Sequence, residues 1–253
     1  MARIFITGST DGLGLFNART LIGQGHDVVL HARTNERATA VHDLDSAGIA
    51  IGDLASDSQT RSIAEQVNAI GRMDAVIHNA GVYLSGSRVS TPEGHSRTLA
   101  VNVLAPYLLT VLIERPHRLV YVTSGMHLGV RSDLADIDWT SRHWSAGQAY
   151  SESKLYVAAL AAAVARRWTD VLSNSVDPGW VPTRMGGPGA SDDLGLGHDT
   201  QSWLAVSDDP AATVTGDHWH HRRHQRPAPE VNDPAFQDKL VSTLAGITGT
   251  PLH

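Results

Sequence analysis

A tyrosine and a lysine four residues apart form the pair with the greatest potential for chemistry in this chain. They bound the segment Tyr150-Ser-Glu-Ser-Lys154. Residues four apart share one face of a helix, so the Lys154 ammonium is expected near the Tyr150 phenol. Lysine is rare here, two residues against eighteen arginines, which favours a specific role for Lys154. A phenol beside a cation can donate a proton to a substrate or accept one, which is general acid–base chemistry.

A glycine-rich turn supplies the second chemical signal. Residues 7–14 read Thr-Gly-Ser-Thr-Asp-Gly-Leu-Gly and follow a strand-like segment. Glycines there allow a tight turn and a close approach of the backbone to a diphosphate, and the next helix offers its unpaired N–H groups. A glycine-rich turn without a ligand is the alternative. The residues predicted to contact a dinucleotide here are Gly8, Ser9, Thr10, Gly12, Leu13 and Gly14.

The residues after the second and third expected strands indicate which dinucleotide is bound. Arg33 and Thr34 stand where an enzyme selective for NAD usually has an acidic residue, and an arginine matches a 2′-phosphate. NADP is therefore the predicted cofactor, with NAD as the alternative. Arg37 either assists Arg33 or is solvated. Asp53, followed by Leu54, either accepts a hydrogen bond from the adenine amino group or caps the following helix.

The elements that must position these residues alternate between strands and helices. Strands are expected at Arg3–Thr7, Asp27–His31, Ala47–Gly52, Asp74–His78, Arg118–Thr123 and Leu172–Val176. Helices are expected at Leu13–Gly23, Ser58–Ile70, about Gly94–Ile113 and Ala149–Trp168. This alternation implies right-handed crossovers and a mostly parallel sheet covered on both faces. The predicted fold class is α/β, a single-domain doubly wound Rossmann-type fold over residues 1–253.

Two long segments interrupt the alternation, at about 125–149 and 182–206. Both follow the carboxyl end of a strand, where open parallel sheets bind their ligands, so both are predicted to be substrate loops. Residues 201–206 are expected to form a short lid helix. The apolar side chains that could line the pocket, or could equally belong to the core, are Met126, Trp144, Trp180, Met185 and Trp203.

Composition narrows the function classes. The chain has 253 residues, a formal net charge of −6 and no cysteine, which favours neither nucleic acid nor an anionic membrane as a partner. The first residues run directly into a strand, so no signal peptide is expected. The longest apolar run, at 155–165, is too short to span a bilayer. The sequence predicts a cytoplasmic protein.

Two further features have competing interpretations. The segment His218–His224 contains four histidines and looks like a metal or anion site, but a basic surface loop with unrelated histidines is preferred, so no metal is predicted. It follows a strand-like stretch at 212–215.

The expected helix Ala149–Trp168 is apolar on nearly all sides and needs burial on more than one face. A homodimer or homotetramer is therefore expected.

Six segments together resemble the short-chain dehydrogenase/reductase family over nearly the whole chain. The glycine turn has the spacing Thr-Gly-x-x-x-Gly-x-Gly, residues 178–183 have Pro-Gly-x-x-x-Thr, and Tyr150 and Lys154 complete a Tyr-x-x-x-Lys motif. The other three segments are His78-Asn79-Ala80-Gly81, Val101-Asn102-Val103 and Thr123-Ser124. His78 replaces an asparagine of the family, which is expected to alter a hydrogen bond in strand packing.

The resemblance implies a role for each matched residue. Tyr150 is the general acid or base, and Ser124 holds the substrate oxygen. Lys154 stabilises the phenolate and binds the ribose of the cofactor, while Asn102 supports a proton relay through a water molecule. The matched residues expected to contact the cofactor are Asn79, Ala80, Gly81, Tyr150, Lys154, Pro178, Gly179, Val181 and Thr183.

The spacing between Ser124 and Tyr150 points to a branch of that family. These residues are 26 positions apart, more than in compact members, and the inserted segment is similar to that of retinol-dehydrogenase-like reductases. The prediction is an NADP-preferring oxidoreductase that interconverts a small-molecule alcohol and its carbonyl compound, with a lipophilic substrate expected. The alternatives are a dinucleotide-binding redox-sensing regulator without turnover, and an epimerase or dehydratase, which would be expected to have a longer chain.

Overall fold

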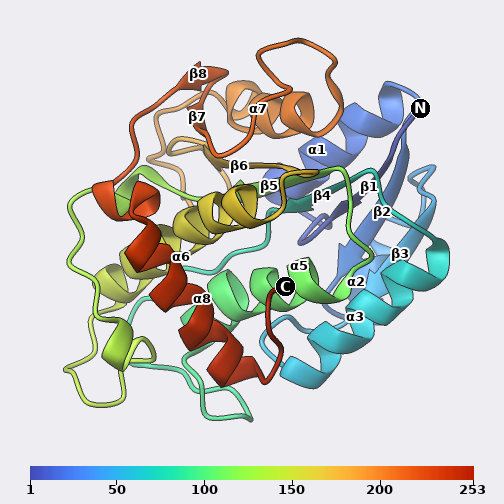
Figure 1. Ribbon diagram of the computed structural model, residues 1–253. Coiled ribbons are helices and arrows are strands. Elements are labelled where there is room, and N and C mark those ends of the chain that lie inside the picture. Colours follow the sequence, from blue (N-terminus) through green and yellow to red (C-terminus); the bar gives the residue numbers. More distant parts are fainter.

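One eight-stranded sheet organises the protein (Figure 1), and the computed structural model describes all residues from 1 to 253. The strand order is β3-β2-β1-β4-β5-β6-β7-β8, and every neighbouring pair is parallel except β7 and β8. This confirms the predicted Rossmann-type α/β class. The strands are β1 (Arg3–Ile6), β2 (Asp27–Ala32), β3 (Gly48–Ile51), β4 (Ala75–His78), β5 (Arg118–Val122), β6 (Leu172–Asp177), β7 (His218–His220) and β8 (Arg223–His224).

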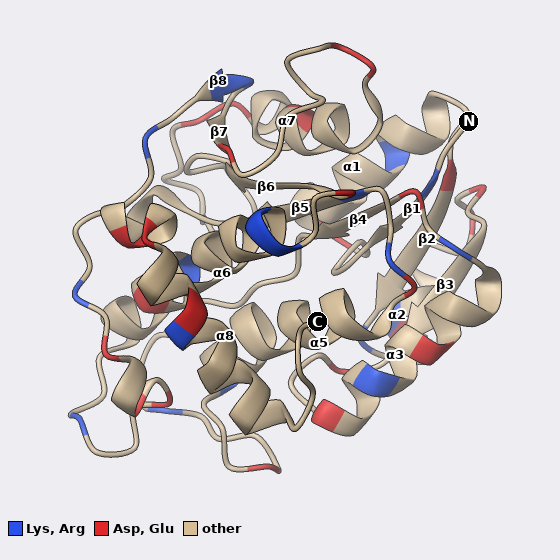
Figure 2. Ribbon diagram, in the orientation of Figure 1, with Lys and Arg blue, Asp and Glu red and all other residues tan.

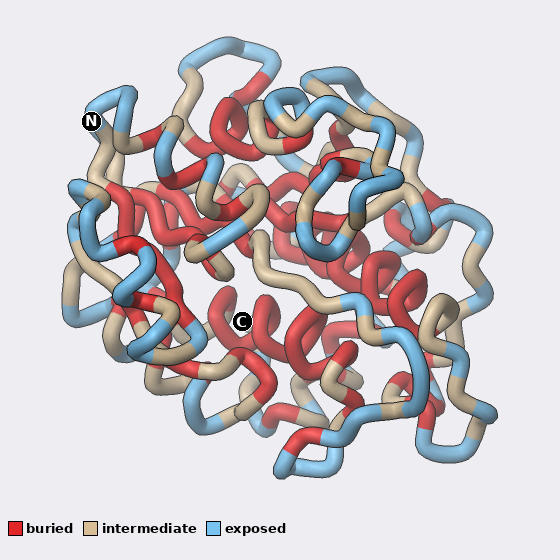
Figure 3. The backbone as a smooth tube through the Cα atoms, turned by 180° about the vertical axis from the view of Figure 1, so that it is seen from behind, coloured by how far each residue is buried: buried red, intermediate tan, exposed pale blue.

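Helices cover both faces of the sheet, and the strands between them are buried (Figure 3). The helices are α1 (Gly12–Gly23), α2 (Asn35–Thr39), α3 (Asp57–Ile70), α4 (Arg97–Leu99), α5 (Ala105–Leu112), α6 (Ala146–Arg167), α7 (Leu194–Val206) and α8 (Pro234–Thr248). Strand side chains such as Ile4 and Ile6 pack with α1 and α7, whereas Phe5 on the opposite face packs with α3, α5 and α6. None of these helices combines the length and the apolar composition needed to cross a bilayer.

The strand order predicts a ligand site at the carboxyl edge of the sheet. β1 lies between β2 and β4, so the chain winds in opposite directions on the two sides of the β1–β4 pair. Ligands of open α/β sheets bind at such a switch point. The turns that follow β1, β4, β5 and β6 all leave this edge, and they carry the glycine-rich turn, Asn79, Ser124 and Asp177.

The expected long helix at Gly94–Ile113 is interrupted. It starts only at Arg97, and a π-helical turn at Ala100–Leu104 separates α4 from α5. Pro106 lies near the start of α5, where a proline is tolerated because the first N–H groups of a helix have no partner within it. The widened turn contains Asn102, and such turns are frequent at functional sites.

The expectation of a lid helix at 201–206 is wrong. Helix α7 begins at Leu194, and its second half is buried against α1. The Asn17 amide of α1 donates to Gln201 at 2.6 Å, and the Ser202 hydroxyl donates to Asn17 at 2.7 Å. Such a satisfied buried network fixes the helix in place, so only residues 182–193 remain a loop.

The histidine-rich segment is also not a surface loop. The strand-like stretch at 212–215 is a turn, and the strand is β7, which pairs with β6 and forms a two-residue hairpin with β8. His218 and Trp219 are buried, whereas His220 and His221 stack on each other. No group of three or more potential metal-ligating side chains gathers here or elsewhere in the chain.

The apolar helix α6 is covered within the chain. All residues from Ala149 to Ala165 are buried, and α8 packs beside α6 (Figure 1) together with the 3-10 turn at Pro229–Asn232. A homodimer or homotetramer was expected because α6 needs burial on more than one face. Helix α8 buries the remaining face within the chain, so the burial of α6 no longer requires a second subunit, and the oligomer stays a prediction.

His78 belongs to a buried polar network behind β4. Thr110 donates its hydroxyl hydrogen to the Pro106 carbonyl at 2.7 Å, so its oxygen must accept from His78 Nε2 at 3.2 Å and from the Tyr121 hydroxyl at 2.7 Å. The His78 ring stacks on Tyr121, and its Nδ1 atom has no partner. His78 is therefore a neutral ring with its proton on Nε2.

Protonation of this ring is expected to destabilise the fold at acidic pH. Burial lowers the pKa of His78 to about 3, whereas the unfolded chain protonates it near pH 6.5. Its contribution is therefore complete above about pH 6.5 and is lost as the pH falls toward 3, by about 1.4 kcal/mol per pH unit. We expect the free energy of unfolding, measured by urea titration, to fall about 1.4 kcal/mol less per pH unit between pH 6.5 and pH 5 in His78→Asn than in the unmodified protein. His143→Asn at an exposed position is the control, and equal slopes in both variants would contradict the assignment.

Candidate active site

The glycine-rich turn has the shape of a phosphate-binding loop. Gly8 and Gly12 have φ angles of 65° and 52°, which side-chain-bearing residues rarely adopt. A side chain at Gly14 would collide with the Gly8 carbonyl, so the helix approaches the turn closely only because glycine stands there. The Asn79 amide donates to the carbonyls of Thr7 at 2.9 Å and of Gly8 at 3.3 Å. Asn79 therefore holds this loop, and Ala80 and Gly81 follow it at the same edge.

A histidine that sequence reasoning missed fixes the turn to the neighbouring strands. The Gly8 N–H donates to His31 Nδ1 at 2.9 Å, so His31 Nε2 must carry the proton that it donates to the Gly52 carbonyl at 2.9 Å. The His31 N–H donates to the Ser9 hydroxyl. Burial lowers the pKa of His31, which keeps the ring neutral, as both bonds require. A polar residue inside the apolar strand β2 was the available signal.

Two arginines flank the place expected for a 2′-phosphate. Arg33 follows β2 directly and is exposed, with no hydrogen bond to the rest of the chain. Arg37 is not a solvated helix residue, because it donates to Thr10 at 3.2 Å and forms an ion pair with Asp11 at 2.5 Å. The Thr34 hydroxyl caps α2 by accepting from the Arg37 N–H, which leaves its hydrogen free to donate. A positive rim therefore borders the glycine turn.

Asp53 does not cap the helix that follows it. The N-cap of α3 is Ser56, whereas Asp53 accepts from the Ala55 N–H at 2.9 Å and pairs with Arg97 at 3.0 Å. The capping alternative is wrong, and the adenine contact remains a prediction. Leu54, the other residue expected at the adenine, is buried beside it.

Tyr150 and Lys154 lie together in the first turns of α6, whose start is set by Ser145 accepting from the Gln148 N–H. Lys154 Nζ donates to the Val122 carbonyl at 2.9 Å and lies 5.7 Å from the centre of the Tyr150 ring. Burial lowers the pKa of Lys154 to about 8, and the Asp177 carboxylate opposes this shift. A side chain at Gly81 would lie 3.2 Å from Nζ, so the Gly81 position must stay small.

Ser124 follows β5 after one residue and lies next to the Tyr150 phenol. Its oxygen accepts from the Met126 N–H at 3.3 Å, which leaves the hydroxyl hydrogen free to donate. Burial raises the pKa of Tyr150 to about 12, and the hydrogen bond with Ser124 offsets part of this rise. Near neutral pH the phenol therefore keeps its proton while no ligand is bound. The predicted catalytic hydroxyl groups of Ser124 and Tyr150 therefore lie side by side.

Asn102 adjoins the pair from the π-helical turn. Its Oδ1 atom accepts from the Val82 N–H at 2.8 Å, and its amide nitrogen donates to the Val82 carbonyl and to the Ser153 hydroxyl. Both amide hydrogens are thus engaged by protein, and one lone pair of Oδ1 remains. The helix interruption and the site position occur together at this residue, and its expected support of a water relay stays a prediction.

The segment after β6 closes the site opposite the glycine turn. Asp177 accepts from the Gly179 N–H at 3.0 Å, which turns Pro178 and Gly179 back over the sheet edge. Thr183 carbon atoms lie 3.7 and 3.8 Å from the place of a side chain at Gly12, so the two predicted cofactor segments meet. Val181 is buried beneath them.

Apolar side chains surround the Tyr150 hydroxyl. Met185 Sδ lies 4.0 Å from it, and the Tyr83 ring packs edge-on against the Tyr150 ring at 5.0 Å. Met126, Trp180 and Met185 are each about half exposed, so none of the three belongs to the core. Tyr83 was missed, although it directly follows the Ala80-Gly81-Val82 turn.

Two tryptophans considered for the pocket wall, Trp203 and Trp144, instead pack against other parts of the chain. Trp203 lies in α7 and packs edge-on against Trp219 in the buried core. Of its two interpretations, the core position is therefore confirmed and the pocket position is wrong. Trp144 donates to the Gly86 carbonyl at 2.9 Å and packs on Trp139. Trp139 in turn donates to the buried Glu152 carboxylate at 3.1 Å. The loop at 125–149 is thereby anchored to the same helix that carries Tyr150.

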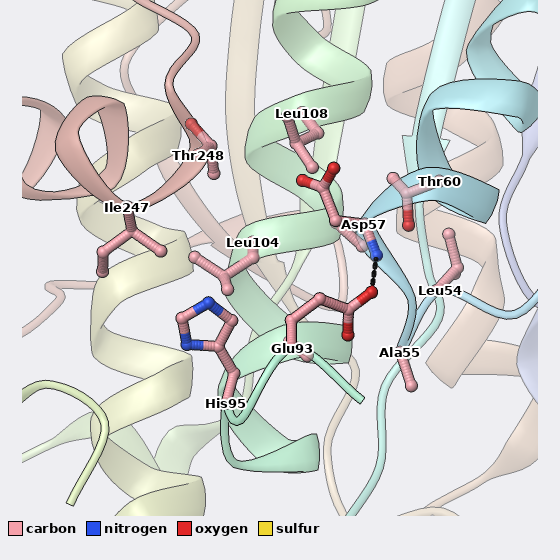
Figure 4. A pocket seen from close by; sticks show the side chains of 12 residues that line it. Leu54, Ala55, Asp57, Thr60, Glu93, His95, Leu104, Leu108, Ile247 and Thr248 are labelled. Atoms are coloured by element: carbon pink, nitrogen blue, oxygen red, sulfur yellow. Dashed lines mark hydrogen bonds between the residues drawn. The ribbon is translucent and has the colours of Figure 1, made fainter. Parts of the chain in front are cut away.

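A separate cavity is lined by neither Tyr150 nor Lys154 (Figure 4). It has a volume of about 220 Å³ and lies between α3, α5 and the end of α8, with Leu54 at its inner wall. Glu93 borders it and accepts from the Asp57 N–H at 3.0 Å. This contact satisfies the amino terminus of α3, so the carboxylate has a structural role.

Comparison with known proteins identifies the family. A family model described as short chain dehydrogenase matches residues 2–193, and the chain belongs to this family of oxidoreductases. It is 42% identical over 258 residues to short-chain dehydrogenase chyC of Penicillium rubens, across 100% of this chain and 99% of that protein. Identity to the putative daunorubicin C-13 ketoreductase DnrU of a Streptomyces species is 34%, across 97% of this chain and 92% of the relative.

More distant matches agree with this assignment. Human retinol dehydrogenase 13 is 26% identical across 97% of this chain and 84% of its own length, which confirms the resemblance to retinol dehydrogenases. A solved structure of a putative uncharacterized protein from Mycobacterium paratuberculosis superimposes with a TM-score of 0.86 at 25% identity, across 100% of this chain and 95% of the other. The fold prediction is thus confirmed by an independent likeness.

Proposed function

We propose that the protein transfers a hydride between NADP and an alcohol or carbonyl compound, with Tyr150 as the general acid or base. The bound cofactor supplies or accepts the hydride at its nicotinamide ring. Ser124 and Tyr150 hold the substrate oxygen by two hydrogen bonds, and Tyr150 donates its proton to that oxygen as negative charge develops there. Lys154 supplies positive charge beside the phenol and donors for a ribose.

The observation that carries this proposal is the convergence of Ser124, Tyr150 and Lys154 at the crevice bordered by the glycine turn. Lys154 donates to the last residue of β5, and Ser124 follows that strand after one residue. A dinucleotide-binding regulator would need no such set of proton-handling groups. The complete set therefore favours turnover over the regulatory alternative.

The electrostatics of the site favour carbonyl reduction near neutral pH. Reduction needs a protonated Tyr150, and burial keeps the pKa of this phenol at about 12. Oxidation needs the phenolate, so it requires either alkaline pH or the positive charge of the oxidised cofactor. We therefore infer that the protein works as a reductase at neutral pH.

The pocket wall favours a bulky apolar substrate. Tyr83 and Met185 offer apolar and aromatic surface beside the reacting hydroxyl, and the loops after β5 and β6 add the half-exposed side chains of Met126 and Trp180. Apolar pockets with few polar groups bind apolar ligands. The name of the DnrU relative indicates a ketone substrate, and retinol is a lipophilic alcohol. We propose a lipophilic, preferably aromatic, ketone.

The direct test is a screen of ketones and aldehydes of graded size, in which turnover is measured as the decrease in NADPH absorbance. Aryl and polycyclic ketones are expected to give higher kcat/KM than short aliphatic ketones. Binding of NADPH without turnover of any carbonyl compound, and without oxidation of the matching alcohols, would support the regulatory alternative instead.

Selection of NADP is expected to depend on Arg33. Its exposed guanidinium can form charged hydrogen bonds with a 2′-phosphate, and such bonds contribute about 1.5–3 kcal/mol each. We expect Arg33→Asp to reduce the preference for NADPH over NADH, as the ratio of their kcat/KM values, by about 100-fold. Arg19→Asp makes the same charge change at an exposed position of α1 and serves as the control. A preference for NADH in the unmodified protein, or an unchanged ratio in Arg33→Asp, would contradict this cofactor assignment.

A further inference from the structure

We propose that His127 is a positioning residue that fixes the backbone of Ser124, so that the Ser124 hydroxyl faces the substrate oxygen. The inference rests on the proposed function, because it concerns the geometry of the same reaction. His127 lies in the loop after β5 and is fully buried, with 0% of its surface exposed. It touches neither the Tyr150 hydroxyl nor the glycine turn, so it acts through Ser124.

His127 holds the Ser124 carbonyl with two donors. Its backbone N–H donates to this carbonyl at 3.1 Å, and its ring Nδ1 lies 2.6 Å from the same oxygen. A carbonyl can only accept, so the ring proton must be on Nδ1. The backbone bond alone closes a 3-10 turn at Gly125–His127, whose hydrogen-bond geometry is intrinsically poor. The ring bond therefore supplies the directional restraint on the peptide that follows the serine.

The opposite ring nitrogen attaches this turn to a distant part of the chain. The Ala228 N–H donates to His127 Nε2 at 3.3 Å. This bond requires an unprotonated Nε2, which agrees with a proton on Nδ1. Ala228 is buried and packs on α6 together with Val231, in the segment that leads into α8 and passes the loop after β5 (Figure 1). One imidazole thus links the catalytic serine to the C-terminal cover of α6.

Neighbouring side chains prevent the ring from turning away. The His218 ring packs edge-on against it at 4.9 Å. His218 is held in turn by the Ser175 hydroxyl, 2.8 Å from its Nδ1 atom. Ser124 itself is restrained from the other side by the Met126 N–H. With the ring flipped by 180°, its carbon atoms Cδ2 and Cε1 would take the places of Nδ1 and Nε2, so the bonds with the Ser124 carbonyl and the Ala228 N–H would both be lost.

The test is a double-mutant cycle between His127 and Ser124, measured as kcat for ketone reduction. His127→Leu keeps the bulk of the side chain and removes both polar atoms, and it is expected to lower kcat by about 30-fold while the Kd for NADPH changes less than about twofold. Ser124→Ala is expected to lower kcat by about 100-fold. If His127 acts through the serine hydroxyl, His127→Leu in the Ser124→Ala background costs less than about threefold more.

Two conservative variants separate positioning from general support of the fold. His127→Asn retains a donor near the place of Nδ1, and His127→Gln retains an acceptor near the place of Nε2. We expect Asn to restore kcat to within about fivefold of the unmodified protein and Gln to restore thermal stability without restoring kcat.

The outcomes distinguish this inference from the proposed function. Losses that multiply in the double variant, or rescue of kcat by Gln rather than Asn, would overturn the positioning role while leaving the role of Ser124 intact. Full activity of Ser124→Ala would overturn the role of Ser124 itself and the inference with it.

Discussion

Tyr150→Phe is expected to lower kcat for ketone reduction at least about 1000-fold, because it removes the only acidic proton placed at the substrate oxygen. The ring remains, so its packing with Tyr83 and its place in α6 are preserved. The Kd for NADPH should change by less than about threefold, measured by quenching of protein fluorescence. Turnover and cofactor binding are thus expected to separate in this variant.

The neighbouring tyrosine provides a matched control. Tyr83→Phe removes the same atom from a ring whose centre lies 5.0 Å from that of Tyr150. Its hydroxyl forms no hydrogen bond within the chain, and it is expected to retain kcat within about threefold, with any change appearing in KM for the ketone. Equal losses in the two variants would show that the reaction depends on the apolar wall rather than on a proton from Tyr150.

The sequence predicted which strand-end motifs lie together, because parallel strands end at the same edge of a sheet. The glycine turn, the Asn79 segment, Ser124 and the Pro178–Thr183 segment each follow a strand. The glycine turn, Asn79, Ser124 and Asp177 therefore had to meet once the strand and helix alternation was recognised. The distance from Tyr150 to Lys154 followed from helix geometry alone. These inferences needed no long-range contact to be known.

The parts that sequence reasoning missed depend on contacts between distant segments. His127 has meaning only when Ala228, 101 positions later, lies beside it. The burial of α6 depends on α8, whose own sequence does not name its partner. Helix α7 contains two glycines and one histidine among its first five residues, so its apolar periodicity is weak. Its docking depends on Asn17 of α1. The strand β7 is short and rich in histidine, and its burial comes from β6 and the hairpin with β8.

The charge balance around the phenol leads to the second large expected effect. A cation about 6 Å away, at an effective dielectric constant of ~20, stabilises a phenolate by about 3 kcal/mol, or about two pKa units. Lys154 lies at 5.7 Å from the ring centre. Lys154→Met is therefore expected to lower kcat for alcohol oxidation about 100-fold at pH 8 and to move the ascending limb of its pH profile upward by about two pH units. The KM for the cofactor should rise as well, because the donors toward the ribose are lost.

Asp177 offers a control that acts in the opposite direction. Its carboxylate raises the pKa of both Tyr150 and Lys154, so Asp177→Asn should move the limb for oxidation to lower pH, with reduction at pH 7 little changed. Lys154→Arg restores the charge, but the larger guanidinium must enter a space bounded by Gly81 and the Val122 carbonyl. We therefore expect its kcat for alcohol oxidation to exceed that of Lys154→Met by less than about tenfold. Limbs that coincide in the Met and Asn variants would show that neither charge controls the proton on Tyr150. Opposite shifts would establish that one buried cation and one buried anion set the pH range in which the site oxidises alcohols.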